Sequence, residues 1–355
     1  MVHKISLTIF ILTLSATVFA QSGRVKPSET PSPKKEMPRP SVVYMPTQTV
    51  SKPSATTITT PKIEDDDIIK VDSALVPIPV SVLDAGGQTV DNLKLEDFAL
   101  LIDGEAANIG EISRSETPVR LALLFDNSSS VTIAREFEKK AAVRFFKRVL
   151  RPSKDLAALF SVSTGTRLEQ PLTKDVSQIV QAIENFPAPQ GATALLDGII
   201  KAAEYLREAD GRRVIVIVSD GEDTISDSTF EETMKAVQAA NVQVYVVKTK
   251  DFENYKQTGQ RIGNANIRAL AAERRMQDIT AQTGGAVYSP IDDRELDRAF
   301  DQISAELAQQ YVLSYYPESE AQKPGEFRTI SLSVKTGRNL TVRTRKGYYV
   351  PKNVR

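Results

Sequence analysis

Hydrophobic residues in the middle of the chain follow two patterns that alternate. Short, almost continuous apolar runs are followed by stretches in which apolar residues return every three or four positions, as in residues 119–125 and then 134–150. The first pattern is typical of strands buried on both faces, and the second of amphipathic helices. Their repeated alternation predicts an α/β fold, with helices on both faces of a doubly wound, mostly parallel sheet.

This α/β block is expected to span residues 118–309. The predicted strands are 119–125, 156–162, 167–172, 214–218, 242–247 and 286–289, and the predicted helices are 134–150, 176–186, 193–209, 229–240, 269–283 and 292–309. Because a short turn precedes residues 167–172, we expect that strand to be antiparallel to its neighbour. Residues 248–267 are polar and contain Asn, Gln and Gly, which indicates an excursion beyond the carboxyl edge of the sheet.

The segments on either side of the block have β patterns. In residues 68–115, Pro77 and Pro79 indicate an edge strand, since proline has no N–H for a ladder. An Asp103-Gly104 turn predicts a hairpin there. Neither this segment nor residues 310–355 has enough strands to close a sandwich alone. We therefore expect them to pair into one small β-sandwich-like domain; two separate β appendages are the alternative.

The first 67 residues differ in composition from the rest. A basic start and an apolar run that ends at Ala20 indicate a signal peptide over residues 1–20, cleaved after Ala20. The run is shorter than the ~20 apolar residues of a membrane span, so an uncleaved anchor is less favoured and we expect no stable span after cleavage. Residues 21–67 are rich in Pro, Ser and Thr, which predicts a disordered linker.

Composition excludes several functions. The 45 acidic and 45 basic residues balance, so no bulk charge favours nucleic acid. The chain has no cysteine and its one histidine, His3, lies in the predicted signal, which removes disulfides, His-based zinc sites and the common nucleophile pairs. We therefore expect that this protein is not an enzyme. An exported protein without disulfides is typical of a bacterial periplasm, cell envelope or secreted fraction.

Oxygen-bearing side chains occur at three places in the α/β block. These are the loop after the predicted strand 119–125, the start of the predicted helix 193–209 and the loop after the predicted strand 214–218. Ligands of open α/β sheets bind where the strands end, and hard oxygen ligands favour Mg²⁺ or Mn²⁺. The alternative is a turn and helix cap, since Asp and Ser are common before helices. Asp223 is expected to be a solvated turn carboxylate, and a role in bracing the loop is the alternative. The predicted metal ligands are Asp126, Ser128, Ser130, Thr193 and Asp220.

The order Asp-x-Ser-x-Ser, Gly-x-Thr and Asp-Gly resembles the metal-ion-dependent adhesion site of von Willebrand factor A domains, and all five positions match. The resemblance covers about residues 118–309. It implies that Asp126, Ser128 and Ser130 bind the ion and that Thr193 binds it directly or through water. Asp220 is implied to support these ligands without usually binding the ion itself. A sixth position is left for a partner's carboxylate. The whole arrangement also resembles a bacterial group of exported proteins related to this domain.

The favoured function is an exported, metal-dependent protein-binding or adhesion module. Its Mg²⁺ or Mn²⁺ would accept an Asp or Glu carboxylate from a partner protein. The alternative is a structural component of the cell envelope whose ion only stabilises the fold. A hydrolase that uses the ion is a weaker alternative, because no residue stands out as a base.

Overall fold

The computed structural model describes residues 75–114, 117–129, 132, 135–151, 153–260, 267–317, 323–337 and 339–350. These residues belong to one compact unit. The predicted signal peptide, the predicted linker and the candidate ligand Ser130 lie outside the described residues.

The central sheet has six strands in the order β10-β9-β8-β5-β6-β7. All neighbouring pairs are parallel except β6 and β7, which are antiparallel. The predicted doubly wound sheet and its one antiparallel strand are confirmed. The strands are β5 (Val119–Asp126), β6 (Leu156–Val162), β7 (Thr166–Thr173), β8 (Arg212–Ser219), β9 (Val242–Lys248) and β10 (Val287–Tyr288).

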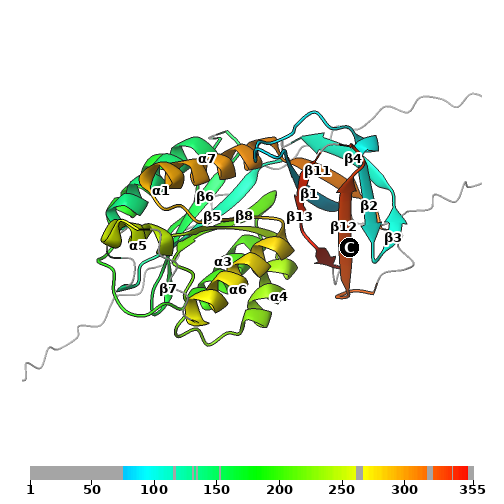
Figure 1. The fold of residues 1–355 in the computed structure, drawn as a ribbon. Helices are drawn as coiled ribbons and strands as arrows, with labels where there is room; N and C mark the ends of the chain where they lie inside the picture. Colours follow the sequence, from blue (N-terminus) through cyan, green and yellow to red (C-terminus); the bar gives the residue numbers. More distant parts are fainter. Residues whose placement is uncertain are drawn as a thin grey trace, which may run out of the picture. The chain divides into compact units, whose positions relative to one another are not determined.

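Helices cover both faces of this sheet (Figure 1). Side chains of β5 alternate between the two faces: Leu121 and Leu123 pack with α1, α2 and α7, whereas Ala122 and Leu124 pack with α3, α4 and α6. Burial on both faces explains why the strands are almost entirely apolar. The helices are α1 (Arg135–Val149), α2 (Val176–Glu184), α3 (Leu195–Arg207), α4 (Phe230–Ala239), α5 (Lys250–Thr258), α6 (Ile267–Thr283) and α7 (Asp293–Gln309).

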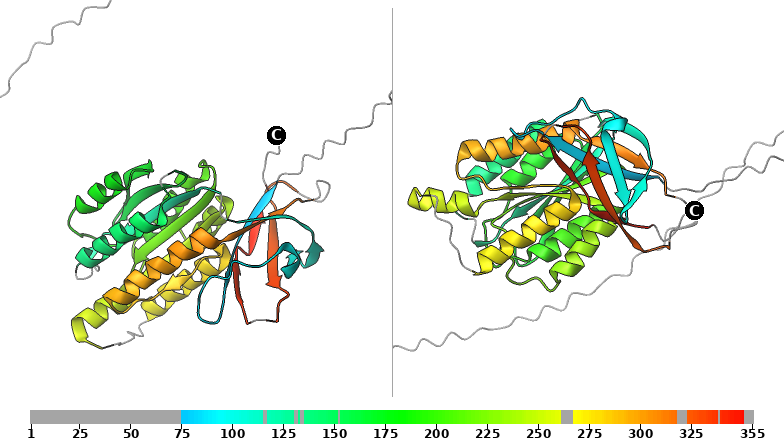
Figure 2. Two further views of the ribbon diagram at one scale, coloured as in Figure 1. Left: turned by 90° about the horizontal axis from the view of Figure 1, so that it is seen from above. Right: turned by 45° about the vertical axis from the view of Figure 1, so that its right-hand side comes forward.

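Two four-stranded sheets, in the orders β13-β1-β11-β4 and β14-β12-β2-β3, combine strands from before and after the α/β block. Figure 2 shows these early and late strands side by side. They enclose a common core that includes Val80, Phe98, Leu313 and Tyr348. The strands are β1 (Val76–Leu83), β2 (Phe98–Ile102), β3 (Glu105–Ala107), β4 (Ile109–Arg114), β11 (Tyr311–Tyr315), β12 (Phe327–Val334), β13 (Thr341–Thr344) and β14 (Gly347–Tyr349).

The hairpin prediction is confirmed, and the edge-strand prediction is wrong. Asp103 and Gly104 both have positive φ, 49° and 86°, and join β2 to β3. However, β1 lies between β13 and β11. Its prolines are tolerated because Pro77 and Pro79 pair only with β11, while the β13 register begins at Val80. The missing N–H groups therefore fall where β1 has a single neighbour.

The polar excursion after β9 contains a helix that the sequence did not predict. This helix, α5, ends at Thr258 and is capped by Gly259, which has φ 68°. Few apolar residues occur in it, but the side chain of Phe252 is fully buried. The Thr249 N–H donates to the carbonyl of Ser219 (3.0 Å), so α5 starts at the edge of the sheet where β8 ends.

Candidate metal site

The loops that carry the candidate ligands are hydrogen-bonded to one another at the carboxyl edge of the sheet. The Ser129 N–H donates to the carbonyl of Gly191 (3.1 Å), which ties the loop after β5 to the loop before α3. The Thr224 N–H donates to the carbonyl of Thr193 (2.9 Å), which ties that second loop to the segment after β8. The fold thus holds the three loops together as one cluster.

Asp126 is the last residue of β5 and is only 1% exposed. Its Oδ1 accepts a hydrogen bond from the Ser128 N–H (2.9 Å), and its Oδ2 accepts one from the Ser219 hydroxyl (2.6 Å). Burial raises the pKa of Asp126 to about 6, and the negative charge of Asp220 adds to this effect. The carboxyl group is held in one orientation and keeps lone pairs for a cation.

The other described candidates lie at the same edge. Ser128, Thr193 and Asp220 are all buried. Asp220 Oδ1 accepts a hydrogen bond from the Glu222 N–H (2.9 Å), and Lys250 Nζ lies 3.8 Å from Asp220 Oδ2. Four of the five predicted ligands therefore belong to one buried cluster. Their sharing of an ion stays a prediction, as does the role of Ser130.

The chemistry of these groups fits a hard divalent cation. Asp126 and Asp220 are buried and close enough to repel each other electrostatically, and a cation between them would relieve that repulsion. Within the described part of the chain, no three Asp, Glu, His or Cys side chains group closely enough to hold a metal by themselves. An ion here would need the hydroxyl oxygens of Ser128 and Thr193, which suit Mg²⁺ or Mn²⁺ better than zinc.

Asp223 caps a helix, so the prediction of a solvated turn carboxylate is wrong. Its Oδ1 accepts hydrogen bonds from the backbone N–H groups of Leu195 (2.7 Å) and Leu196 (3.2 Å) at the start of α3. The N-cap residue of α3 is Ala194, whose side chain has no acceptor, so these N–H groups need one from elsewhere. Asp223 thereby braces the loop that carries Thr193.

Two buried acids beside the cluster were missed by the sequence analysis. Glu138 on α1 is 1% exposed, and Glu253 on α5 is 4% exposed. For Glu138 a signal existed, because it shares the helical spacing of the buried residues Ala141 and Phe145. Glu253 gave no such signal, since the helix that buries it was not predicted.

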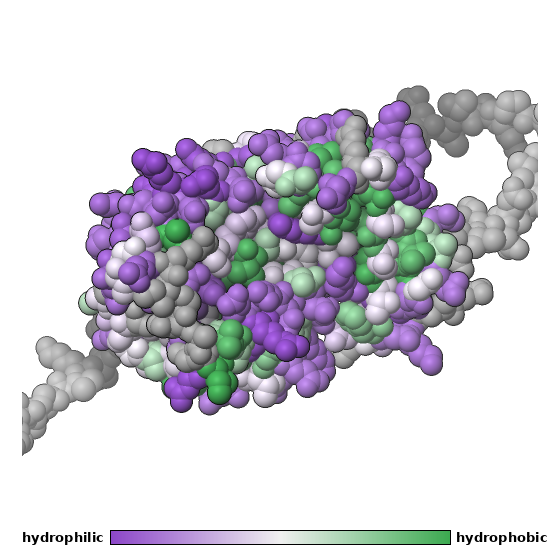
Figure 3. All heavy atoms as spheres, viewed as in Figure 1, coloured by the Kyte–Doolittle hydropathy of each residue, from purple (hydrophilic) through white to green (hydrophobic). Residues whose placement is uncertain are grey.

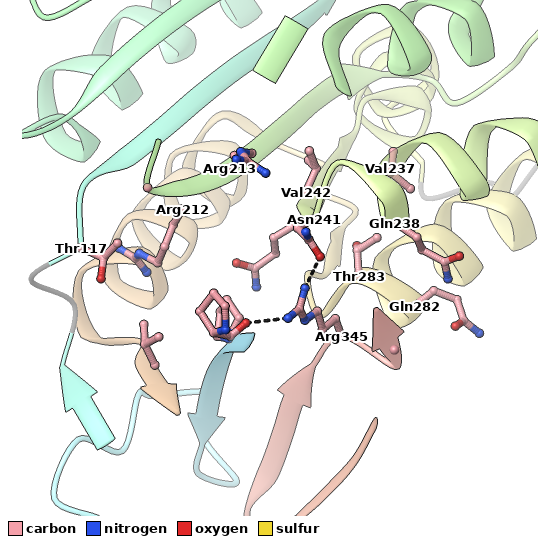
Figure 4. A pocket seen from close by; sticks show the side chains of 16 residues that line it. Thr117, Arg212, Arg213, Val237, Gln238, Asn241, Val242, Gln282, Thr283 and Arg345 are labelled. Carbon is pink, nitrogen blue, oxygen red and sulfur yellow. Dashed lines mark hydrogen bonds between the residues drawn. The ribbon is translucent and has the colours of Figure 1, made fainter. Parts of the chain in front are cut away.

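A cavity of about 360 Å³ lies at the end of β8 that is away from the candidate site, and three arginines are among its lining residues (Figure 4). Their guanidinium groups donate to backbone carbonyls: Arg212 to Leu307 (2.8 Å), Arg345 to Pro77 (2.7 Å) and Arg213 to Ala240, the C-cap of α4 (2.9 Å). These hydrogen bonds tie the arginines to neighbouring backbone, and the bond of Arg345 reaches β1.

Comparison with known proteins finds a described domain family over the part of the chain that carries the candidate ligands. Residues 121–222 match the family model of the von Willebrand factor type A domain. The collagen alpha-1(VI) chain of Gallus gallus is similar to this chain, with 25% identity over 201 residues. That alignment covers 49% of this chain and 19% of the collagen chain, so this chain spans about a fifth of its relative's length.

Solved structures of low sequence identity are also similar. A von Willebrand factor type A protein from Catenulispora acidiphila has a TM-score of 0.44 and 11% identity, over 79% of this chain and 74% of its own. BatB from Bacteroides thetaiotaomicron has a TM-score of 0.42 and 16% identity, over 54% of this chain and 99% of its own. With the family match lying on the strands and loops described above, this chain contains a von Willebrand factor type A domain.

Proposed function

We propose that this protein is an exported binding module that captures a protein partner through a divalent cation. Von Willebrand factor type A domains are in general interaction modules rather than enzymes, so the domain implies protein partners. In the proposed site, Asp126, Ser128, Ser130 and Thr193 hold Mg²⁺ or Mn²⁺, and Asp220 supports them. The cation then accepts an Asp or Glu carboxylate of the partner.

The observation that supports this function best is the joining of three ligand-bearing loops around Asp126. Each loop contributes an oxygen-bearing side chain, and backbone hydrogen bonds hold the loops together. With few carboxylates among its ligands, a bound cation keeps positive charge and attracts a further carboxylate. The interaction should therefore depend on the metal as well as on the protein surface.

The surface next to the site has room for a partner. A hollow of about 350 Å³ is lined by Glu222, Asp223, Thr224 and the start of α6. Ile267 and Leu270 of α6 are 86% and 56% exposed. The face shown in Figure 3 is mostly hydrophilic, with separate hydrophobic patches. Exposed aliphatic side chains beside a polar loop suit a protein contact with a small apolar part.

Export is part of the proposal and rests on the sequence pattern of residues 1–20. No helix in the described ranges combines the length and hydropathy needed to cross a membrane. We place the protein in the periplasm, the cell envelope or the secreted fraction of a bacterium.

The second candidate function is a structural envelope component in which the ion only stabilises the fold. Burial of Asp126, Ser128, Thr193 and Asp220 favours it, since a partner cannot reach fully covered ligands. The two functions differ in what a chelator does. For a structural role, removal of the metal lowers the melting temperature but leaves every protein contact of the folded chain unchanged.

The proposed function predicts that capture of partners requires both the cation and Asp126. The immobilised full chain is incubated with envelope extract in Mg²⁺, in EDTA, and in EDTA followed by excess Mg²⁺. We expect proteins that are retained in Mg²⁺, lost in EDTA and regained on restoring Mg²⁺, and that Asp126→Asn does not retain. Capture of the same proteins in EDTA or by the folded variant would refute metal-dependent binding.

A further inference from the structure

Helix α5 covers the edge of the sheet on which the candidate site lies. Its first turn follows Thr249, whose N–H donates to the carbonyl of Ser219, and the Ser219 hydroxyl in turn donates to Asp126. At the start of the helix, Lys250 Nζ approaches Asp220 Oδ2 (3.8 Å) and Glu222 Oε1 (3.6 Å). In Figure 1 this helix lies at the end of the α/β block away from β1, β11 and β13.

Glu253 lies on the inner face of α5, one turn after Thr249. Its N–H donates to the Thr249 carbonyl (3.0 Å), as in a regular helix. The side chain is buried, and its Oε1 has no hydrogen-bond partner among the described residues. Burial, followed by the charge of Asp220, raises the pKa of Glu253 to about 8. Such a buried acceptor is unfavourable unless a donor or a cation compensates for it.

Glu138 brings a second acid to the same place from α1. Both of its carboxyl oxygens are buried and make no hydrogen bond of normal geometry in the described ranges, and the Thr249 hydroxyl is a nearby donor that lowers its pKa. Burial, and then the charges of Glu253 and Asp126, hold the pKa of Glu138 well above its usual value. Glu138, Glu253, Asp126 and Asp220 thus influence one another electrostatically, although no three described acids group closely enough to hold a metal by themselves. Lys250 and Arg135 are the neighbouring basic groups. A divalent cation would supply the compensation that the two glutamates lack.

We propose that Glu253 is this chain's own carboxylate ligand for the cation at the Asp126 site. Glu138 adds negative charge behind it without binding the ion. The site is then closed by α5, and a partner's carboxylate must take the place of Glu253. This inference rests on the proposed function and deepens it, because it explains how buried ligands can serve a binding site. It also gives α5 a regulatory role, since access requires Glu253 to leave.

The test uses Tb³⁺ as an oxygen-binding probe, with luminescence lifetimes in H₂O and D₂O to count the water molecules on the bound ion. Glu253→Ala should increase this count by about one and weaken Mg²⁺ binding by at least about tenfold, since a carboxylate that binds the ion directly is replaced by water. Glu253→Asp should give the same increase, because the shorter side chain cannot reach. Glu138→Gln should weaken Mg²⁺ binding without a change in the water count.

Asp251→Asn is the matched control. It removes one acid from the same helix two positions away, on a different face, and should leave the water count and the Mg²⁺ affinity unchanged. Circular dichroism confirms that each variant is folded. An unchanged water count and affinity in both Glu253 variants would overturn the inference while leaving the Asp126 site intact. Failure of the wild-type protein to bind Tb³⁺, or equal binding by Asp126→Asn, would refute the proposed function as well.

Discussion

Asp126→Asn should reduce the affinity of the protein for Mg²⁺ and Mn²⁺ by about 100-fold or more. The substitution keeps the shape of the side chain and the acceptor for the Ser128 N–H, but it removes the charge that a divalent cation needs. Replacing a residue that only supports the metal ligands typically weakens metal binding by about 10–100-fold. Replacing Asp126, which is proposed to bind the ion directly, should therefore weaken binding by at least the upper part of that range. Isothermal titration calorimetry measures the effect directly.

The control for this variant is Asp278→Asn on α6. Asp278 is an exposed acid whose neighbour Arg274 lies 4.0 Å away, so the change in net charge matches that of Asp126→Asn. Its Mg²⁺ affinity should equal that of the wild-type protein. Equal affinities for the two variants would mean that cation binding, if present, does not involve Asp126.

Replacement of Glu138 by Met should stabilise the chelator-treated protein by about 1–3 kcal/mol, because an unsatisfied buried polar group carries a cost of this size. Met has a similar length, lacks acceptor oxygens and adapts to irregular apolar surroundings. Ala141 and Ala142, about one turn further along α1, are fully buried. The substitution also removes the repulsion between Glu138 and the acids Glu253 and Asp126. Urea unfolding in EDTA measures the free energy of unfolding.

A matched substitution separates this effect from a general gain by methionine. Glu136→Met changes an acid two residues away whose side chain is 77% exposed, and it should alter stability by less than about 0.5 kcal/mol. Saturating Mg²⁺ should reduce or reverse the gain in unfolding free energy of Glu138→Met over the wild-type protein. The wild-type protein binds the cation more tightly and is therefore stabilised more by it. Lower stability of Glu138→Met in EDTA would show that the buried acid is satisfied in the fold.

The central sheet could be predicted from the sequence because its strands are buried on both faces. Residues 119–125 and 214–218 are nearly unbroken apolar runs, and they lie within two neighbouring strands, β5 and β8. A strand that is buried on both faces is apolar at nearly every position, so its sequence pattern identifies it directly. The positions of Asp126 and Asp220 at the carboxyl edge follow from the same pattern.

Features that depend on tertiary contacts could not be predicted in this way. Helix α5 buries Phe252 but presents mostly polar residues, so its pattern is that of a loop. The capping role of Asp223 depends on its meeting the start of α3, 28 residues away along the chain. The position of β1 depends on β13, whose register starts only after the prolines. In each case a distant partner determines the local structure.

The most direct test of the account is a crystal structure with Mn²⁺ bound, with data collected at the manganese absorption edge. We expect one anomalous difference peak at the carboxyl edge of the sheet, within about 2.0–2.3 Å of oxygens of Asp126, Ser128 and Ser130. Thr193 should bind the same ion directly or through one water molecule, and Asp220 should lie behind these ligands. At saturating Mn²⁺, a map without a peak there, or with the ion bound by other residues, would contradict the claim that these three loops form a cation site.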